Sequence, residues 1–134
     1  MNYSSTAKSI AKDKAIIVIK QSHIDFGITT ETDALLPNPA ELFLGSLSSC
    51  MLKNVERFST FMNFSYSTAE ITINATRLEK PPRIDEINYV LKIYSSQENI
   101  NVELLKKNIE KHGTIYNTVK EVCSISGEIA IMVE

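Results

Sequence analysis

The chain has 134 residues, 43% of them hydrophobic, which fits a single domain large enough to bury a core without disulfide staples. Its 14 basic and 16 acidic residues leave a net charge of -2 and form no basic stripe, so nucleic acid is not an expected partner. A helix needs about 18 apolar residues to cross a bilayer, and apolar runs such as residues 15–19 are far shorter. The N-terminus also lacks the charged and then apolar stretches of a signal peptide. We therefore expect a cytoplasmic protein that does not bind membranes.

The first part of the chain predicts a small sheet. Residues 14–20 are apolar and β-branched, which is typical of a strand, and residues 23–30 predict the strand that pairs with it. We interpret residues 1–11 as either a loose arm or an edge strand. Residues 32–38 contain Pro37 and predict a loop that leads out of this sheet.

A long helix is predicted to follow the loop. Asn38 suits the N-cap, Pro39 the first helical position and Glu41 the third, so the helix starts with the residues of a capping box. Apolar residues then recur every three or four positions, which predicts a helix of roughly six to seven turns that ends near Met62. The recurring residues before it are Leu44, Leu47, Met51, Val55 and Phe58. Because other apolar side chains lie outside this stripe, we expect most of the helix surface to be buried.

Two alternating segments after the helix predict an antiparallel hairpin. Residues 66–78 and 87–93 each alternate apolar and polar side chains, and residues 79–83 include two prolines that suit the turn. One face of the hairpin is therefore expected to lie on the core. Strands, a long helix, a hairpin and further elements in this order predict a single α+β domain that spans the whole chain.

The last third predicts two helices and a strand. Residues 101–111 carry apolar side chains at helical spacing, and Gly113 is expected to end this helix in the left-handed conformation. Residues 114–121 predict a further short helical stretch. Residues 124–133 predict the final strand, with a bulge at Gly127.

Two motifs resemble those of one known family. The first is Asn38-Pro39-x-Glu41-Leu42 followed by a helix that reaches Cys50, and the second is the segment 111–118, KHGTIYNT. In this order and separation they are similar to the OsmC/Ohr family, the osmotically inducible and organic hydroperoxide resistance proteins, over nearly the whole chain after about Lys14. The resemblance implies antiparallel sheets around a long central helix, in an intertwined homodimer with its active site at the interface. It also implies reduction of organic hydroperoxides by a peroxidatic cysteine on the central helix, helped by a resolving cysteine, an arginine and a glutamate.

The resemblance assigns the peroxidatic cysteine to Cys50, but the other three positions differ. The resolving cysteine would fall at Gly113, and the assisting glutamate would fall at Ala40. Glu41 is nine residues before Cys50 and, at about 100° per residue, lies on the opposite side of the helix. The family's arginine lies upstream of the central helix, whereas Arg57, Arg77 and Arg83 all lie downstream. Either one of these three arginines or a lysine such as Lys14 or Lys20 would have to substitute for it.

Other residues of the two motifs have both a functional and a structural interpretation. Cys50 is either a reactive thiol or a small buried hydrophobe, whereas Cys123, at the entrance to the last strand, is interpreted as a core residue. Tyr116 and Asn117 either line the pocket that Cys50 faces, as binding residues, or serve packing. His112 suits a helix C-terminus, and neither histidine has partners at a metal-binding spacing, so we expect no metal and no cofactor.

Three functions follow from these residues, and enzymatic activity is left open. The first is a redox or stress-response role, in which Cys50 reduces hydrophobic organic peroxides as a one-cysteine peroxidase and an external thiol or dithiol restores it. The second is binding of a small apolar ligand without catalysis. The third is a structural role for the fold alone.

Overall fold

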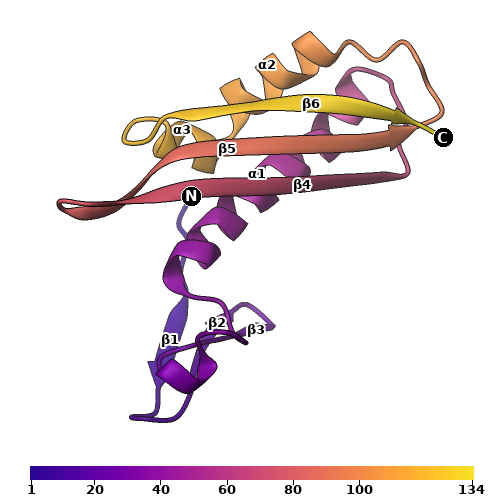
Figure 1. The fold of residues 1–134 in the computed structure, drawn as a ribbon. Helices are drawn as coiled ribbons and strands as arrows, with labels where there is room; N and C mark the ends of the chain where they lie inside the picture. Colours follow the sequence, from indigo (N-terminus) through magenta and orange to yellow (C-terminus); the bar gives the residue numbers. More distant parts are fainter. The chain divides into compact units, whose positions relative to one another are not determined.

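The computed structural model describes residues 1–134 and contains two three-stranded sheets and three α-helices (Figure 1). The chain divides into two compact units, Met1–Phe43 and Leu44–Glu134. The first unit holds the sheet β1-β2-β3, and the second holds the sheet β4-β5-β6. The predicted α+β class is confirmed, and each unit is described by itself below.

The first unit is the predicted small sheet. Strand β1 (Thr6–Ser9) pairs antiparallel with β2 (Ala15–Ile19), which pairs antiparallel with β3 (Ser22–Phe26). The predicted hairpin is confirmed, and residues 1–11 contain an edge strand. The return strand ends at Phe26, before Gly27, whose backbone N–H donates to the Pro37 carbonyl at 3.1 Å. A short 3₁₀ helix, η1 (Thr30–Thr32), follows.

Helix α1 (Pro39–Phe61) begins and ends within one residue of its predicted bounds. The Asn38 side chain accepts the backbone N–H of Glu41 at 2.8 Å, and the Glu41 carboxylate accepts the backbone N–H of Asn38 at 3.0 Å. These two bonds are the predicted capping box. One face of the helix is buried, whereas Phe61 on another face is 69% exposed, so a single chain leaves apolar helix surface uncovered.

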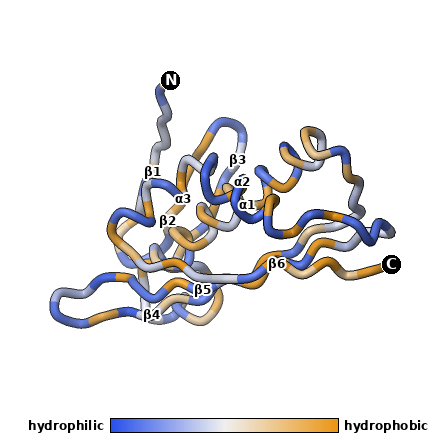
Figure 2. The backbone as a smooth tube through the Cα atoms, turned by 90° about the horizontal axis from the view of Figure 1, so that it is seen from above, coloured by the Kyte–Doolittle hydropathy of each residue, from blue (hydrophilic) through white to orange (hydrophobic).

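The sheet of the second unit combines an antiparallel and a parallel pair. Strand β4 (Thr68–Glu79) forms the predicted hairpin with β5 (Pro82–Ser95), and β6 (Ile125–Val133) runs parallel to β5. A parallel neighbour needs a crossover connection, which α2 (Val102–His112) and α3 (Thr114–Val119) provide. All three helices lie on one face of this sheet, whose β5 residues there are buried: Ile87, Tyr89, Leu91 and Ile93 (Figures 1 and 2).

Two predictions about glycines were wrong. Gly113 has φ -82° and ψ 115°, an extended conformation, so it does not end α2 in the left-handed region. Gly127 lies in regular register opposite Tyr89, and the only register shift in this sheet falls between Asn74 and Thr76. At both positions the backbone conformation is one that other residues also adopt, and glycine is required because it has no side chain. A Cβ at Gly127 would overlap the Tyr89 ring.

Asp85 joins the start of β6 to β5. Its carboxylate accepts the backbone N–H groups of Ser124 and Glu86, each at 2.8 Å, and forms an ion pair with Arg83 at 3.1 Å. Hydrogen bonds from Ser124, then Glu86 and Arg83, lower the pKa of Asp85 to about 2 from its ordinary 3.8. The fold therefore favours the ionised carboxylate.

We expect Asp85→Asn to lower the urea midpoint of unfolding at pH 7 and to have little effect at pH 2. Because the pKa is about 2 in the folded state and 3.8 ordinarily, the stabilisation is fully present above about pH 4 and is lost as the pH falls toward 2. Urea titrations of both proteins at pH 7, 4, 3 and 2 measure this difference. A difference that persists unchanged down to pH 2 would contradict the role of the charge.

Candidate functional site

Cys50 lies in the middle of α1, in contact with the junction between α2 and α3. Its thiol is free and half-buried. A Cβ placed on Gly113, the residue between the two helices, would lie 3.1 Å from the Cys50 Sγ. The structure thus brings together Cys50 and Gly113, the position at which the family resemblance places the resolving cysteine.

Gly113 allows this close approach because it has no side chain. A Cβ there would also lie 2.9 Å from the Tyr116 Cβ and 3.0 Å from the Ile109 carbonyl oxygen, both tighter than ordinary contacts. Any larger residue would therefore push the α2–α3 junction away from the thiol by a few tenths of an ångström, or force Tyr116 to move. The junction packs directly on the sulfur.

The residues on both sides of Gly113 fix the junction to its surroundings. The His112 ring packs on the Phe58 ring of α1 with a centroid distance of 5.4 Å. The Asn117 side chain donates to the Lys111 carbonyl at 2.9 Å, and its backbone N–H donates to the Gly113 carbonyl at 2.8 Å. Asn117 therefore ties the end of α2 to the start of α3.

Tyr116 is buried beside Gly113 and faces an acidic group. Burial, and then the neighbouring Glu110 carboxylate, raise the pKa of Tyr116 to about 12. Glu110 also accepts a hydrogen bond from the Tyr89 hydroxyl at 3.1 Å and pairs with Lys106 at 3.0 Å. Sequence reasoning missed this cluster, although a tyrosine on the apolar face of a predicted strand is a signal that its hydroxyl needs a polar partner.

Cys123 has a different environment from Cys50. Its Sγ lies 3.2 Å from the Ile84 carbonyl oxygen, to which the thiol donates. Burial raises the pKa of the Cys123 thiol, and the Asp85 carboxylate adds to this increase. Because only the thiolate is nucleophilic, these contacts favour an unreactive Cys123. Cys123 is half-buried, like Cys50, and does not belong to the buried core, so the interpretation of Cys123 as a core residue was wrong.

The three arginines have partners of their own. The Arg57 guanidinium lies over the rings of Phe58 and Phe61, at 5.3 and 5.7 Å from their centroids. The other two form ion pairs, Arg77 with Glu79 at 3.6 Å and Arg83 with Asp85 at 3.1 Å. Glu56, next to Arg57, accepts a hydrogen bond from Tyr66 at 2.6 Å. None of these contacts involves the thiol.

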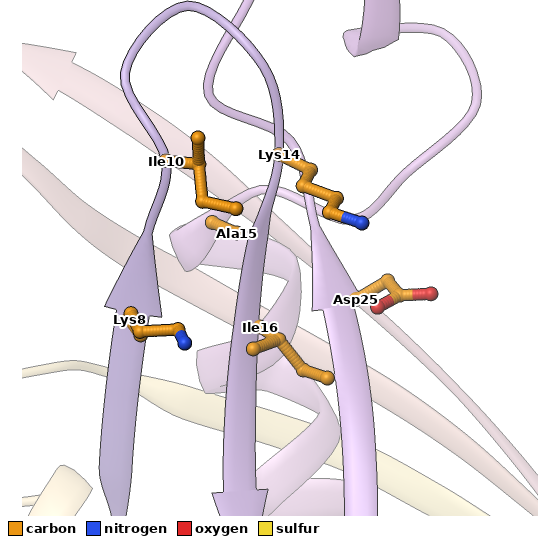
Figure 3. Close-up of a pocket in the computed structure, with 6 residues that line it drawn as sticks. All are labelled: Lys8, Ile10, Lys14, Ala15, Ile16 and Asp25. Carbon is orange, nitrogen blue, oxygen red and sulfur yellow. The ribbon is translucent and has the colours of Figure 1, made fainter.

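Lys14, one of the two lysines considered as a substitute cation, lines a cavity of about 310 Å³ in the first unit. Lys8, Ile16 and Asp25 lie side by side on the three strands of its wall (Figure 3). Ile10 and Ala15 complete the lining. Lys20, the other candidate, lies in the turn between β2 and β3 with a positive φ of 54°.

Three further observations concern ligand binding, metal binding and membrane insertion. A surface hollow of about 540 Å³ lies on α2 and α3 and is lined by charged side chains together with Tyr116. Its charged residues are Glu103, Lys106, Lys107, Glu110, Lys111 and Lys120. No group of three or more histidine, cysteine or acidic residues is placed to hold a metal ion. None of the helices has the length and apolar character that a membrane span requires.

Comparison with known families decides the relationship. The model of the OsmC-like protein family matches residues 30–127, which include Cys50 and the α2–α3 junction. The chain belongs to the OsmC-like family. No curated protein sequence matches it. The OsmC-like fold expected from the two motifs is therefore confirmed, and the differences at Ala40 and Gly113 are those of a divergent member.

Solved structures of OsmC-like proteins share this fold at low sequence identity. An OsmC-like protein from Mycoplasma pneumoniae has a TM-score of 0.87 and 16% identity, with 100% of this chain and 99% of that chain covered. The organic hydroperoxide resistance protein OsmC from Legionella pneumophila has a TM-score of 0.69 and 14% identity, with 96% and 97% covered. The organic hydroperoxide resistance protein OhrB of Bacillus subtilis has a TM-score of 0.62 and 13% identity, with 96% and 98% covered.

Proposed function

We propose that this OsmC-like protein is a cytoplasmic redox protein that reduces organic hydroperoxides through Cys50. The observation that supports this most directly is the 3.1 Å distance between the Cys50 Sγ and the Cβ position of Gly113. In this chain the α2–α3 junction, where the family resemblance places the resolving cysteine, still lies against a thiol on the central helix. Tyr116 and Asn117 hold that junction and are proposed as binding residues at its edge.

The proposed reaction needs an external thiol. The Cys50 thiolate attacks one peroxide oxygen, so that an S–O bond forms, the O–O bond breaks and the departing alkoxide takes a proton to become an alcohol. The resulting sulfenic acid condenses with an external thiol, which releases water and leaves a mixed disulfide. A second thiol then displaces Cys50 as a free thiol. Gly113 cannot take the part of the first thiol, and the Cys123 thiol is engaged with the Ile84 carbonyl.

The absence of the family's assisting groups favours a second candidate, a member that binds a small apolar ligand or serves a structural role without catalysis. Ala40 replaces the glutamate, and each of the three arginines is paired elsewhere. Even if Cys50 is peroxidatic, we therefore expect its reaction with peroxides at neutral pH to be slow, because neither charged group of the family pattern is there to promote the thiolate.

The two cysteines should respond differently to an organic hydroperoxide. We expect dimedone to trap a sulfenic acid at Cys50 and not at Cys123, because the Cys123 thiol is held protonated by its surroundings. Non-reducing peptide mapping after treatment with cumene hydroperoxide measures both sites, and Cys50→Ser is the control. A high yield of a Cys50–Cys123 disulfide, or dimedone label on Cys123 alone, would overturn the assignment. No label on either cysteine would favour the non-catalytic candidate.

We also propose that the protein is a homodimer, as the resemblance implies. Phe61 is 69% exposed on α1, and Ile71 and Ile73 on the core face of β4 are only half-buried in a single chain. A second copy that covers these side chains would bury an interface of more than roughly 2,000 Å². Sedimentation equilibrium at micromolar concentration is expected to give twice the 15.0 kDa chain mass. A monodisperse 15.0 kDa species would rule the dimer out.

A further inference from the structure

The Glu110 carboxylate joins three elements of the second unit. Its Oε2 atom accepts the hydroxyl of Tyr89 on β5 at 3.1 Å and pairs with the ammonium group of Lys106, on its own helix α2, at 3.0 Å. Tyr116 on α3 faces the same carboxylate: burial, and then Glu110, raises the pKa of both tyrosines. The hydroxyls of β5 and α3 therefore meet at one acidic side chain of α2.

Glu110 and Tyr116 lie on either side of the α2–α3 junction. Gly113 comes three residues after Glu110 and three residues before Tyr116, so the contact between these two side chains closes a short segment with Gly113 at its centre. A Cβ placed on Gly113 would lie 2.9 Å from the Tyr116 Cβ and 3.1 Å from the Cys50 Sγ. A shift of Tyr116 would therefore shift the backbone that packs on the sulfur.

Tyr89 anchors these contacts to the sheet. It is 1% exposed, and its ring packs so closely on Gly127 that a Cβ there would lie 2.3 Å from a ring atom. A buried hydroxyl that loses its acceptor is costly, which favours keeping Glu110 in place. The contacts thus run from a fixed ring on β5, through Glu110, to the junction that covers the thiol.

We propose that Glu110 is the positioning residue of the thiol site: it clamps the α2–α3 junction onto the Cys50 sulfur and so limits the size of the molecules that reach it. Without this acceptor two tyrosine hydroxyls lose a partner, and the junction gains freedom to move away from the sulfur. A wider space beside the thiol admits larger reaction partners. The inference deepens the proposed function and rests on it only for the identity of Cys50 as the reacting thiol.

Alkylation of Cys50 by two reagents of different size tests the proposal without any peroxide. The measured quantity is the rate with monobromobimane, which is bulky, divided by the rate with iodoacetamide, which is small. Because both reagents react with the thiolate, a change in the pKa of the thiol cancels in this ratio. In Glu110→Leu, which removes the acceptor, we expect the ratio to rise on the order of tenfold. Glu110→Gln keeps an acceptor oxygen and should stay close to the native ratio.

Two variants and one internal signal serve as controls. Lys106→Met removes the ion pair of Glu110 and leaves both tyrosine contacts. Tyr66→Phe removes a comparable bond, from Tyr66 to Glu56 at 2.6 Å, that involves neither α2 nor α3. Both variants should keep the native ratio, and a rise in either one as large as that in Glu110→Leu contradicts the clamp. Cys123 is labelled in the same samples and assigned by peptide mapping, and its own ratio should not change.

The outcomes separate this inference from the proposed function. A rise in Glu110→Leu that is confined to Cys50 supports the clamp even if Cys50 proves inert toward hydroperoxides, in which case only the peroxidase proposal fails. An unchanged ratio in folded Glu110→Leu, or equal rises at Cys50 and Cys123, overturns the inference. If circular dichroism shows that Glu110→Leu does not fold, Tyr89→Phe and Tyr116→Phe remove one hydroxyl each. A raised ratio in these two variants then supports the clamp, and a native ratio in both overturns it.

Discussion

Gly113→Cys is expected to form a disulfide with Cys50 when the protein is treated with an organic hydroperoxide. The Cβ position of residue 113 lies 3.1 Å from the Cys50 Sγ, and an S–S bond of about 2.04 Å places each Cβ about 3.0 Å from the far sulfur. The bridge can therefore close with little backbone movement. With an internal resolving thiol, we expect turnover with a dithiol reductant to rise on the order of tenfold, because resolution becomes intramolecular. Adding Ala40→Glu should raise it further.

The control for this variant is Gly113→Ala. It meets the same crowding against the Tyr116 Cβ and the Ile109 carbonyl but carries no sulfur, so it should lose some stability and gain no turnover. Non-reducing mass spectrometry directly measures the bridge between Cys50 and the introduced thiol. Two results would show that Cys50 and residue 113 do not meet in solution. One is that Gly113→Cys forms only mixed disulfides with the external thiol, and the other is that Gly113→Cys and Gly113→Ala have equal turnover.

Gly127→Ala is expected to destabilise the second unit by about 2–3 kcal/mol, as overpacking of a core does. Its new methyl group would overlap the ring of Tyr89, the residue opposite it on β5. Tyr89 is 1% exposed, and its hydroxyl is hydrogen-bonded to Glu110, so the ring cannot move aside freely. Urea unfolding followed by circular dichroism measures the loss.

Gly45→Ala is the matched control. Gly45 lies within α1, and a Cβ there meets no atom within 4 Å. Alanine is the better helix former, so this variant should gain about 0.5–1 kcal/mol. A loss of similar size in both variants would show that the Tyr89 contact is not the reason for glycine at position 127.

Local signals predicted most of the fold. The capping box of Asn38 and Glu41 and the alternation of residues 66–78 depend on neighbours in the sequence, and the structure contains both elements. The parallel pairing of β5 with β6 was not predicted, since strand direction depends on where the crossover helices pack. Both glycine errors have one cause: a glycine is suited equally to a left-handed turn and to a close approach, and the sequence near Gly113 and Gly127 does not distinguish them.

The candidate site could be predicted only in part. Cys50 and the α2–α3 segment came from the family motifs, and the structure adds that Gly113 is the point of contact. The Tyr89–Glu110 hydrogen bond joins residues 21 positions apart and depends on packing between β5 and α2.

The most direct test of a peroxidatic Cys50 is the rate at which the protein consumes cumene hydroperoxide in the presence of dithiothreitol. We expect the native protein and Cys123→Ser to show the same slow turnover, and Cys50→Ser to show none above the reductant alone. Turnover by Cys50→Ser equal to that of the native protein, or no turnover by either, would contradict a peroxidatic Cys50.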